Sequence, residues 1–134
     1  MSHLTLEYSE NLRAGGDFAG LCRKLSTFMC ELRIDGAAVF PPGGVRVRAI
    51  SCEDFCIADG SVPDAGFVHA ILKIGAGRSE PARRATCEGL FELMKAHFAA
   101  QFARHGLALS LELSEFSESG TLKHNNLHAR FKRS

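Results

Sequence analysis

The chain opens with Met1-Ser2-His3-Leu4-Thr5-Leu6-Glu7-Tyr8, which predicts the first strand of a sheet. Apolar side chains at positions 4, 6 and 8 alternate with polar ones, and a period of two is typical of a strand with one buried face. Chain ends normally fray, so a strand at this place predicts an α-amino group held inside a fold, where a pocket could use it. The alternative is a first strand that ends in an exposed amine.

Composition predicts one domain over residues 1–134, because 46% of the side chains are hydrophobic and the length suits a single core. With 16 basic and 15 acidic residues the formal charge is +1, which gives no field for nucleic acid or a membrane surface. A small, locally charged partner fits better. No bilayer-spanning apolar run and no leader pattern are present, so we expect a cytoplasmic protein.

Metal binding is not expected from the sequence. The five cysteines show no Cys-x-x-Cys pair, and free thiols agree with a reducing compartment. His124 and His128 are four residues apart, but the alternation over residues 125–131 predicts a strand, on which the two rings would lie about 13 Å apart.

The remaining chain repeats one pattern of strand, helix and strand at an offset of about 60 residues, first over 1–60 and then over 61–115. In the first repeat, an apolar stripe predicts a helix over 17–34, and strict alternation predicts a strand over 45–50.

The second repeat has the same order of elements. Residues 67–74 form a buried strand pattern, a long helix is expected over 79–105, and 107–114 alternate again. Ser79 can cap the helix. The prediction is an α+β fold in which two right-handed βαβ units form a four-stranded mixed sheet with two helices on one face.

The other face of this sheet is left partly apolar, so we expect oligomerisation, with the tail over 116–134 reaching a neighbouring subunit. The part of the tail beyond Thr121 is the natural piece to pair with a neighbour's sheet edge.

Two arginines follow glycine-rich turns at related places in the repeats. Arg46 follows Gly43-Gly44, and Arg78 follows Gly75-x-Gly77. The second turn is not a dinucleotide fingerprint, because Glu80 stands where the third glycine would be. It either aims Arg78 and a helix N-terminus at an anion or is a plain turn with a solvated arginine.

Several motifs together resemble one family. They are His3-x-x-x-Glu7-Tyr8-Ser9, Phe40-Pro41-x-Gly43-Gly44-Val45-Arg46-x-Arg48-Ala49, Ala58-Asp59-Gly60, Phe67-Val68-His69, Lys73-Ile74-Gly75-Ala76-Gly77-Arg78-Ser79, Leu107-Ala108-Leu109-Ser110 and Lys123-x-Asn125-Asn126-x-His128-Ala129. With them the chain resembles the tautomerase superfamily, and within it the 5-carboxymethyl-2-hydroxymuconate delta-isomerase family of homoprotocatechuate breakdown.

This resemblance implies a homotrimer with a pocket at each subunit interface and a cofactor-independent proton shift within a 2-hydroxymuconate-type dicarboxylate. It implies an amino-terminal catalytic base, which is a proline in the family and Ser2 here. It also implies a catalytic role for Arg46 and substrate binding by Arg78, since guanidinium groups bind carboxylates and stabilise a dienolate. The alternative is a dicarboxylate-binding protein that has lost catalysis together with the proline.

Overall fold

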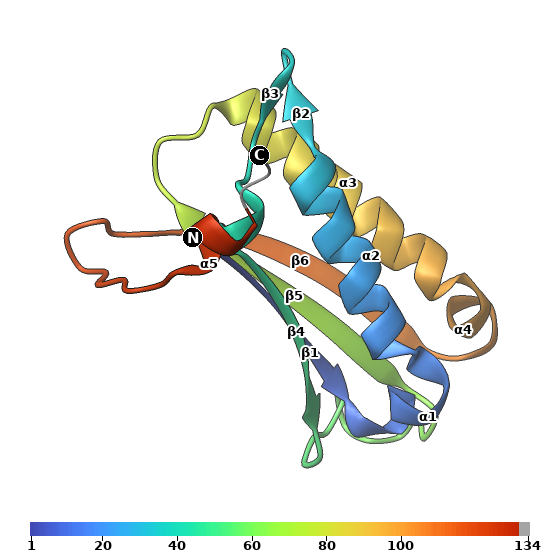
Figure 1. Ribbon diagram of the computed structural model, residues 1–134. Coiled ribbons are helices and arrows are strands. Elements are labelled where there is room, and N and C mark those ends of the chain that lie inside the picture. Colours follow the sequence, from blue (N-terminus) through green and yellow to red (C-terminus); the bar gives the residue numbers. More distant parts are fainter. Residues whose placement is uncertain (132–134) are drawn as a thin grey trace.

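The computed structural model describes residues 1–131 and contains a four-stranded sheet with its two long helices on one face (Figure 1). The strands are β1 (Ser2–Ser9), β4 (Val45–Cys52), β5 (Gly66–Gly75) and β6 (Leu107–Phe116), and the helices are α2 (Phe18–Glu31) and α3 (Glu80–His97). The strand order is β4-β1-β5-β6. β1 runs parallel to β4 and β5 parallel to β6, whereas β1 and β5 are antiparallel. The predicted pair of βαβ units in a mixed sheet is confirmed.

Short elements connect these parts. They are η1 (Glu10–Leu12), α1 (Arg13–Gly16), β2 (Arg33–Ile34), β3 (Ala37–Ala38), η2 (Pro42–Gly44), α4 (Ala99–Arg104) and α5 (Leu127–Arg130). Both β2 and β3 belong to a separate two-stranded hairpin. Of these elements, η2 and α5 lie at the end of the sheet where β1 begins (Figure 1).

The core lies between the sheet and the helices. In β1, Leu4 and Leu6 are fully buried and Tyr8 is 6% exposed, which confirms the predicted inward face. The ring of Tyr8 stacks on Phe18 of α2 with 3.6 Å between the ring centroids. Each large apolar side chain buried in this way contributes about 1.5–3 kcal/mol to stability. The burial fixes the register of β1 and therefore the position of its first residues.

Side-chain caps begin both helices where they were expected. Asp17 accepts a hydrogen bond from the Gly20 amide at 3.1 Å, and Ser79 accepts one from the Ala82 amide at 3.2 Å. These bonds satisfy amide groups that a first helical turn leaves without partners. Arg78 therefore stands directly before a defined helix start.

Two helix ends differ from the prediction. The helix expected over 17–34 ends at Glu31, and the helix expected over 79–105 is interrupted at Phe98, which separates α3 from α4. Phe98 is fully buried and lies 5.6 Å from the Phe18 ring, so tertiary packing takes it out of the helical path. Periodicity alone does not reveal such a break.

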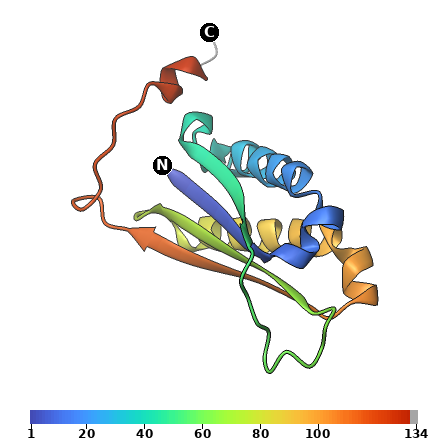
Figure 2. The same cartoon turned by 90° about the horizontal axis from the view of Figure 1, so that it is seen from below.

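The strand predicted over 125–131 is wrong, because Leu127–Arg130 form the helix α5. The side chain of Asn125 accepts a hydrogen bond from the Leu127 amide at 3.1 Å, and this Asx turn starts the helix. Figure 2 shows the tail running from β6 past the N-terminus to α5. In this chain α5 packs against η2; pairing of the tail with a neighbour's sheet remains a prediction, and residues 132–134 lie outside the described part.

Candidate active site

The N-terminal amine lies in a niche formed by η2 and α5. A Cβ atom placed on Gly44 would be 3.6 Å from the Met1 nitrogen and 3.5 Å from Cε1 of His128. At Gly43 the approach is closer, since a Cβ there would meet backbone atoms of His128 at 2.7 Å. The two glycines thus let α5 and the first residue of the chain pack onto the same turn.

Arg46 follows this turn at the start of β4. It pairs in register with His3 of β1, and both side chains are half-buried on the sheet face opposite the helices. Its Nη1 atom is buried and has no hydrogen-bond partner within residues 1–131. A buried donor without a partner is uncommon in folded proteins, and an anion would satisfy it.

Three contacts fix the guanidinium group of Arg78. Its Nε donates to the Val39 carbonyl at 3.2 Å, and its Nη1 donates to the Gly75 carbonyl at 3.3 Å. Its Cζ atom lies 4.5 Å from the centre of the Phe40 ring, which is a cation–π distance. The turn after β5 is therefore tied to the loop before η2, and the arginine is not freely solvated.

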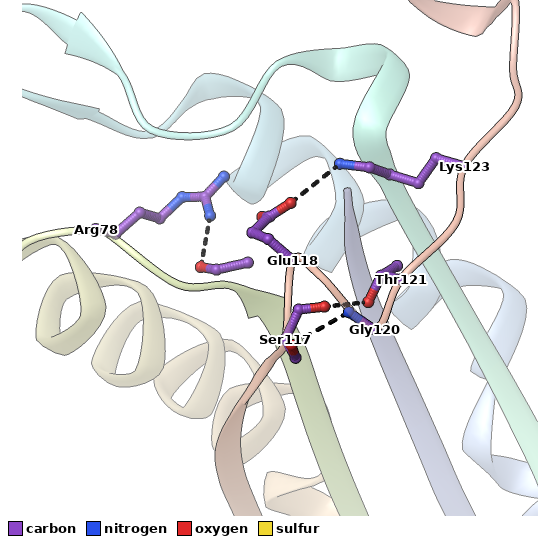
Figure 3. Close-up of polar contacts among 7 residues, drawn as sticks. Arg78, Ser117, Glu118, Gly120, Thr121 and Lys123 are labelled. Atoms are coloured by element: carbon purple, nitrogen blue, oxygen red, sulfur yellow. Dashed lines mark hydrogen bonds and ion pairs between the residues drawn. The ribbon is translucent and has the colours of Figure 1, made fainter.

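Two further charged residues complete what we call the N-terminal site, defined as the Met1 amine with Arg46, Arg78, Glu118 and Lys123. The loop after β6 carries Glu118 and Lys123, whose charged atoms Oε2 and Nζ are 3.6 Å apart. Figure 3 shows the Glu118 carboxylate between Arg78 and Lys123, beside the start of β1.

The charges of the site act on the amine. Burial, followed by the positive charges of Lys123 and Arg78, lowers the pKa of the Met1 amine; Glu118 opposes this, and Arg46 lowers the pKa further. Burial also lowers the pKa of Arg78, with Glu118 acting in the other direction. A guanidinium stays protonated in proteins, so Arg78 remains a cation. An amine with a lowered pKa is unprotonated more often near neutral pH and can act as a base.

The structure brings the sequence-predicted site residues to one end of the sheet. Ser2 is 1% exposed and is the first residue of β1, and with Met1 attached its nitrogen belongs to a peptide bond. Arg46 and Arg78, from different repeats, both act on the amine next to it. Their catalytic and substrate-binding roles stay predictions. Sequence reasoning missed Glu118 and the role of Lys123, although Lys123 stands in a motif that carried the family resemblance.

Neither a cavity nor any metal-binding group or membrane-spanning helix indicates a second functional site in the described chain. A cavity of about 840 Å³ between α2, η2 and α5 is lined by residues such as Cys30 and Val45 and by none of the N-terminal site. Residues 1–131 contain no group of three or more His, Cys, Asp or Glu side chains placed to hold a metal ion. Within the same residues, every helix is too short or too polar to cross a membrane.

A double βαβ sheet whose first strand starts among arginines is the arrangement that the tautomerase resemblance implies. The profile of the 5-carboxymethyl-2-hydroxymuconate isomerase family matches residues 2–131. The 5-carboxymethyl-2-hydroxymuconate Delta-isomerase of Escherichia coli is 40% identical over 132 residues, which cover 98% of this chain and 100% of that protein.

Solved structures agree. A 5-carboxymethyl-2-hydroxymuconate isomerase from Deinococcus radiodurans R1 superposes with a TM-score of 0.89 at 47% identity, covering 98% of this chain and 95% of that one. A 5-carboxymethyl-2-hydroxymuconate delta-isomerase superposes with a TM-score of 0.90 at 34% identity, covering 100% and 95%. This chain belongs to the 5-carboxymethyl-2-hydroxymuconate isomerase family.

Proposed function

We propose that the chain is a cofactor-independent isomerase that shifts a proton within 5-carboxymethyl-2-hydroxymuconate, a tricarboxylate, or within a related 2-hydroxymuconate-type dicarboxylate. Membership of the family and full-length similarity to the Escherichia coli enzyme support this reaction. The observation that carries it is the position of the chain start among Lys123, Arg78 and Arg46, where burial and these cations lower the pKa of the Met1 amine. We expect the same surroundings to lower the pKa of the Ser2 amine when Met1 is removed. A base and carboxylate-binding cations then stand together in one site.

In the proposed mechanism the base is the α-amino group of Ser2, released when Met1 is removed. The unprotonated amine accepts a proton from the substrate, and the remaining electron pair delocalises into a dienolate. The ammonium then returns the proton to another carbon, so the product has the same atoms as the substrate. Arg46 and Arg78 neutralise the dienolate and the carboxylates while the proton is on the amine.

Removal of Met1 matters because of distance. Along an extended strand one residue spans up to about 3.5 Å, while a base has to lie within about 3 Å of the proton that it takes. With Met1 in place the amine is displaced outward by about that length. The proposal therefore requires the processed chain, and the small side chain of Ser2 suits removal of the preceding methionine.

Ser2 also changes the kind of amine. Family members carry an amino-terminal proline, a secondary amine, whereas processing of this chain leaves a primary amine. An α-amino group has an unperturbed pKa of about 7.7–8.0, so a modest lowering suffices for base catalysis at neutral pH. We infer a working but slower enzyme than one with proline.

We further propose that the active form is a homotrimer whose pockets lie at subunit interfaces, and that it serves aromatic catabolism of the homoprotocatechuate type. Two features of the chain support the assembly. The outer strands β4 and β6 have open edges, and the face opposite the helices carries half-buried apolar side chains such as Phe67 and Ile71. Edges and apolar faces of this kind are normally covered.

The reaction is tested with purified processed protein and 5-carboxymethyl-2-hydroxymuconate, by following the loss of dienol absorbance against the rate in buffer. Catalysed conversion that falls sharply in Arg46→Ala is expected. If a saturated dicarboxylate binds in calorimetry but no product forms above the buffer rate, the chain is instead a dicarboxylate-binding protein and the proposed isomerase function is wrong.

A further inference from the structure

The loop after β6 folds back on itself and returns a lysine to the N-terminal site. Two hydrogen bonds drawn in Figure 3 close the turn: the Ser117 Oγ accepts from the Gly120 amide at 3.2 Å, and the Ser117 carbonyl accepts from the Thr121 hydroxyl at 2.6 Å. In addition, the Glu118 carbonyl accepts from the Thr121 amide at 3.4 Å. The result is that Lys123 faces Glu118 across the turn.

Glu118 has a defined place beside the end of β5. A Cβ on Gly75 would lie 2.9 Å from its Oε1 atom, so the carboxylate occupies the space that the missing side chain leaves. The carbonyl of the same Gly75 accepts the hydrogen bond from Arg78. The carboxylate is thus close to the guanidinium of Arg78 on one side and 3.6 Å from the ammonium of Lys123 on the other (Figure 3).

We propose that Lys123 is a third substrate-binding cation of the N-terminal site, and that Glu118 is its internal counter-ion, which a carboxylate of the substrate displaces. This inference rests on the proposed function, because it concerns how the same dicarboxylate is bound. In the empty site Lys123 pairs with Glu118. In the occupied site Lys123 pairs with a carboxylate of the substrate instead.

The exchange is energetically cheap. The side chains of Lys123 and Glu118 are 38% and 60% exposed, and ion pairs this exposed contribute little to stability. Glu118 pairs with Lys123, whereas the hydrogen bonds of the Arg78 guanidinium go to the carbonyls of Val39 and Gly75 in the described chain. A substrate carboxylate that meets both cations therefore gains charge-assisted hydrogen bonds that Glu118 does not supply to both. 5-Carboxymethyl-2-hydroxymuconate carries three carboxylates and 2-hydroxymuconate carries two, while the site offers three side-chain cations. A ligand with two carboxylates can pair with all three cations when one carboxylate lies between two of them.

Other charged groups face the amine as well and bear on any pH dependence. Arg46 of β4 and Arg78 of the turn after β5 are cationic. Burial lowers the pKa of His3 in β1, and the charge of the amine contributes to this lowering. The His128 ring of α5 lies beside Gly44. Substituting Glu118 or Lys123 leaves all four in place. A change common to both variants would therefore point to a disturbed loop, whereas changes of opposite sign reflect the charges themselves.

The test is calorimetric binding of adipate, a saturated six-carbon dicarboxylate, to the full chain. Removing the counter-ion in Glu118→Gln should tighten binding about threefold to tenfold, and Lys123→Met should weaken it by a similar factor. Hexanoate, with one carboxylate, should show smaller changes. Glu92→Gln is the matched control, because it removes a carboxylate from another exposed ion pair, that with Lys95. Glu92 lies about 18 Å along α3 from Glu80, the first residue of that helix. This variant should leave the affinities for adipate and hexanoate unchanged.

Binding is measured without turnover, so this result is independent of whether the chain is an isomerase. Opposite effects of the two variants on adipate support the exchange even if no product forms. Equal affinity of Lys123→Met and the unmodified chain, or weaker binding by Glu118→Gln, would overturn the proposal. Where turnover is present, and at a pH at which the amine is fully unprotonated, Lys123→Met should raise KM for the dicarboxylate with little change in kcat.

Discussion

The guanidinium carbon of Arg78 lies 4.5 Å from the centre of the Phe40 ring, and this contact joins the two βαβ repeats at the N-terminal site. Phe40 is fully buried and precedes η2 in the first repeat, while Arg78 precedes α3 in the second. An aromatic face within about 6 Å of a cation attracts it and restricts its orientation. The position of Arg78, which we propose to bind substrate, therefore depends on a core residue of the other repeat.

Replacing that ring tests the dependence. Phe40→Leu keeps most of the apolar volume but removes the aromatic face, so we expect a loss of about 1–2 kcal/mol in the free energy of unfolding. We also expect a rise in KM of about threefold to tenfold, because Arg78 is less well oriented. Urea unfolding and steady-state kinetics measure the two effects. Phe91→Leu is the control, since Phe91 lies under Lys95 on α3; a KM change of equal size there would contradict the account.

Replacing Arg46 should affect stability and activity differently. Its Nη1 atom is buried without a partner in the described chain, and such a group costs free energy in the folded state. Arg46→Met keeps the aliphatic part of the side chain and removes the charge, so the free energy of unfolding should stay the same or rise by up to about 1 kcal/mol.

In the same variant kcat/KM should fall by about two to three orders of magnitude, as expected when a donor to a developing oxyanion is lost. Thermal unfolding and kinetics on one preparation measure both quantities. An activity near that of the unmodified chain would remove Arg46 from the mechanism, and a strongly lowered melting temperature would mean that its role is structural.

The N-terminal amine predicts a pH dependence. Burial, Lys123 and Arg78 lower the pKa of the Met1 amine, and we expect them to act in the same direction on the Ser2 amine of the processed chain. Its kcat/KM should then rise with pH along an acid limb whose midpoint lies below the ordinary range of an α-amino group. Removing a positive neighbour in Lys123→Met should move this midpoint up, and removing the carboxylate in Glu118→Gln should move it down. Rate profiles between pH 5 and 9 test the signs, with Lys95→Met as the control. Shifts in the reverse directions would contradict the electrostatic assignment.

Replacing Gly43 tests how strongly the contact between η2 and α5 stabilises the C-terminal tail. A Cβ at this position would lie 2.7 Å from backbone atoms of His128, so Gly43→Ala forces η2 and α5 apart. We expect a loss of about 1–3 kcal/mol in stability and faster hydrogen exchange over residues 127–130. Gly15→Ala is the control, because the nearest atom to its new Cβ would be 4.0 Å away. Unchanged exchange in Gly43→Ala would show that α5 does not depend on this contact.

The sequence allowed the four strands and both long helices to be predicted, because each has a regular apolar period and clear caps at Asp17 and Ser79. Phe98 ends α3 because of tertiary packing that a local pattern does not contain. The α5 error has a similar cause, since the Asn125 side chain starts a helix in a segment that alternates like a strand. The seven residues from 125 to 131 were too few for periodicity to decide between a strand and a helix.

Some residues of the candidate site could likewise be predicted from the sequence, and others could not. Arg46 and Arg78 were found because each follows a glycine-rich turn and stands in a motif of the family resemblance. Glu118 has no such signal, and its place depends on a turn that brings together residues 75 and 118 from different elements. Contacts of this kind follow from the folded chain and not from local sequence.

The most direct test of the central claim is the ketonisation rate of 2-hydroxymuconate, measured with the intact mass of the same sample and with a Ser2→Pro variant beside it. The account predicts turnover by chains that lack Met1, little turnover by chains that retain it, and faster turnover when proline replaces Ser2. Equal rates with and without Met1, or no gain from proline in a variant that also lacks Met1, would contradict an amine base at the start of β1.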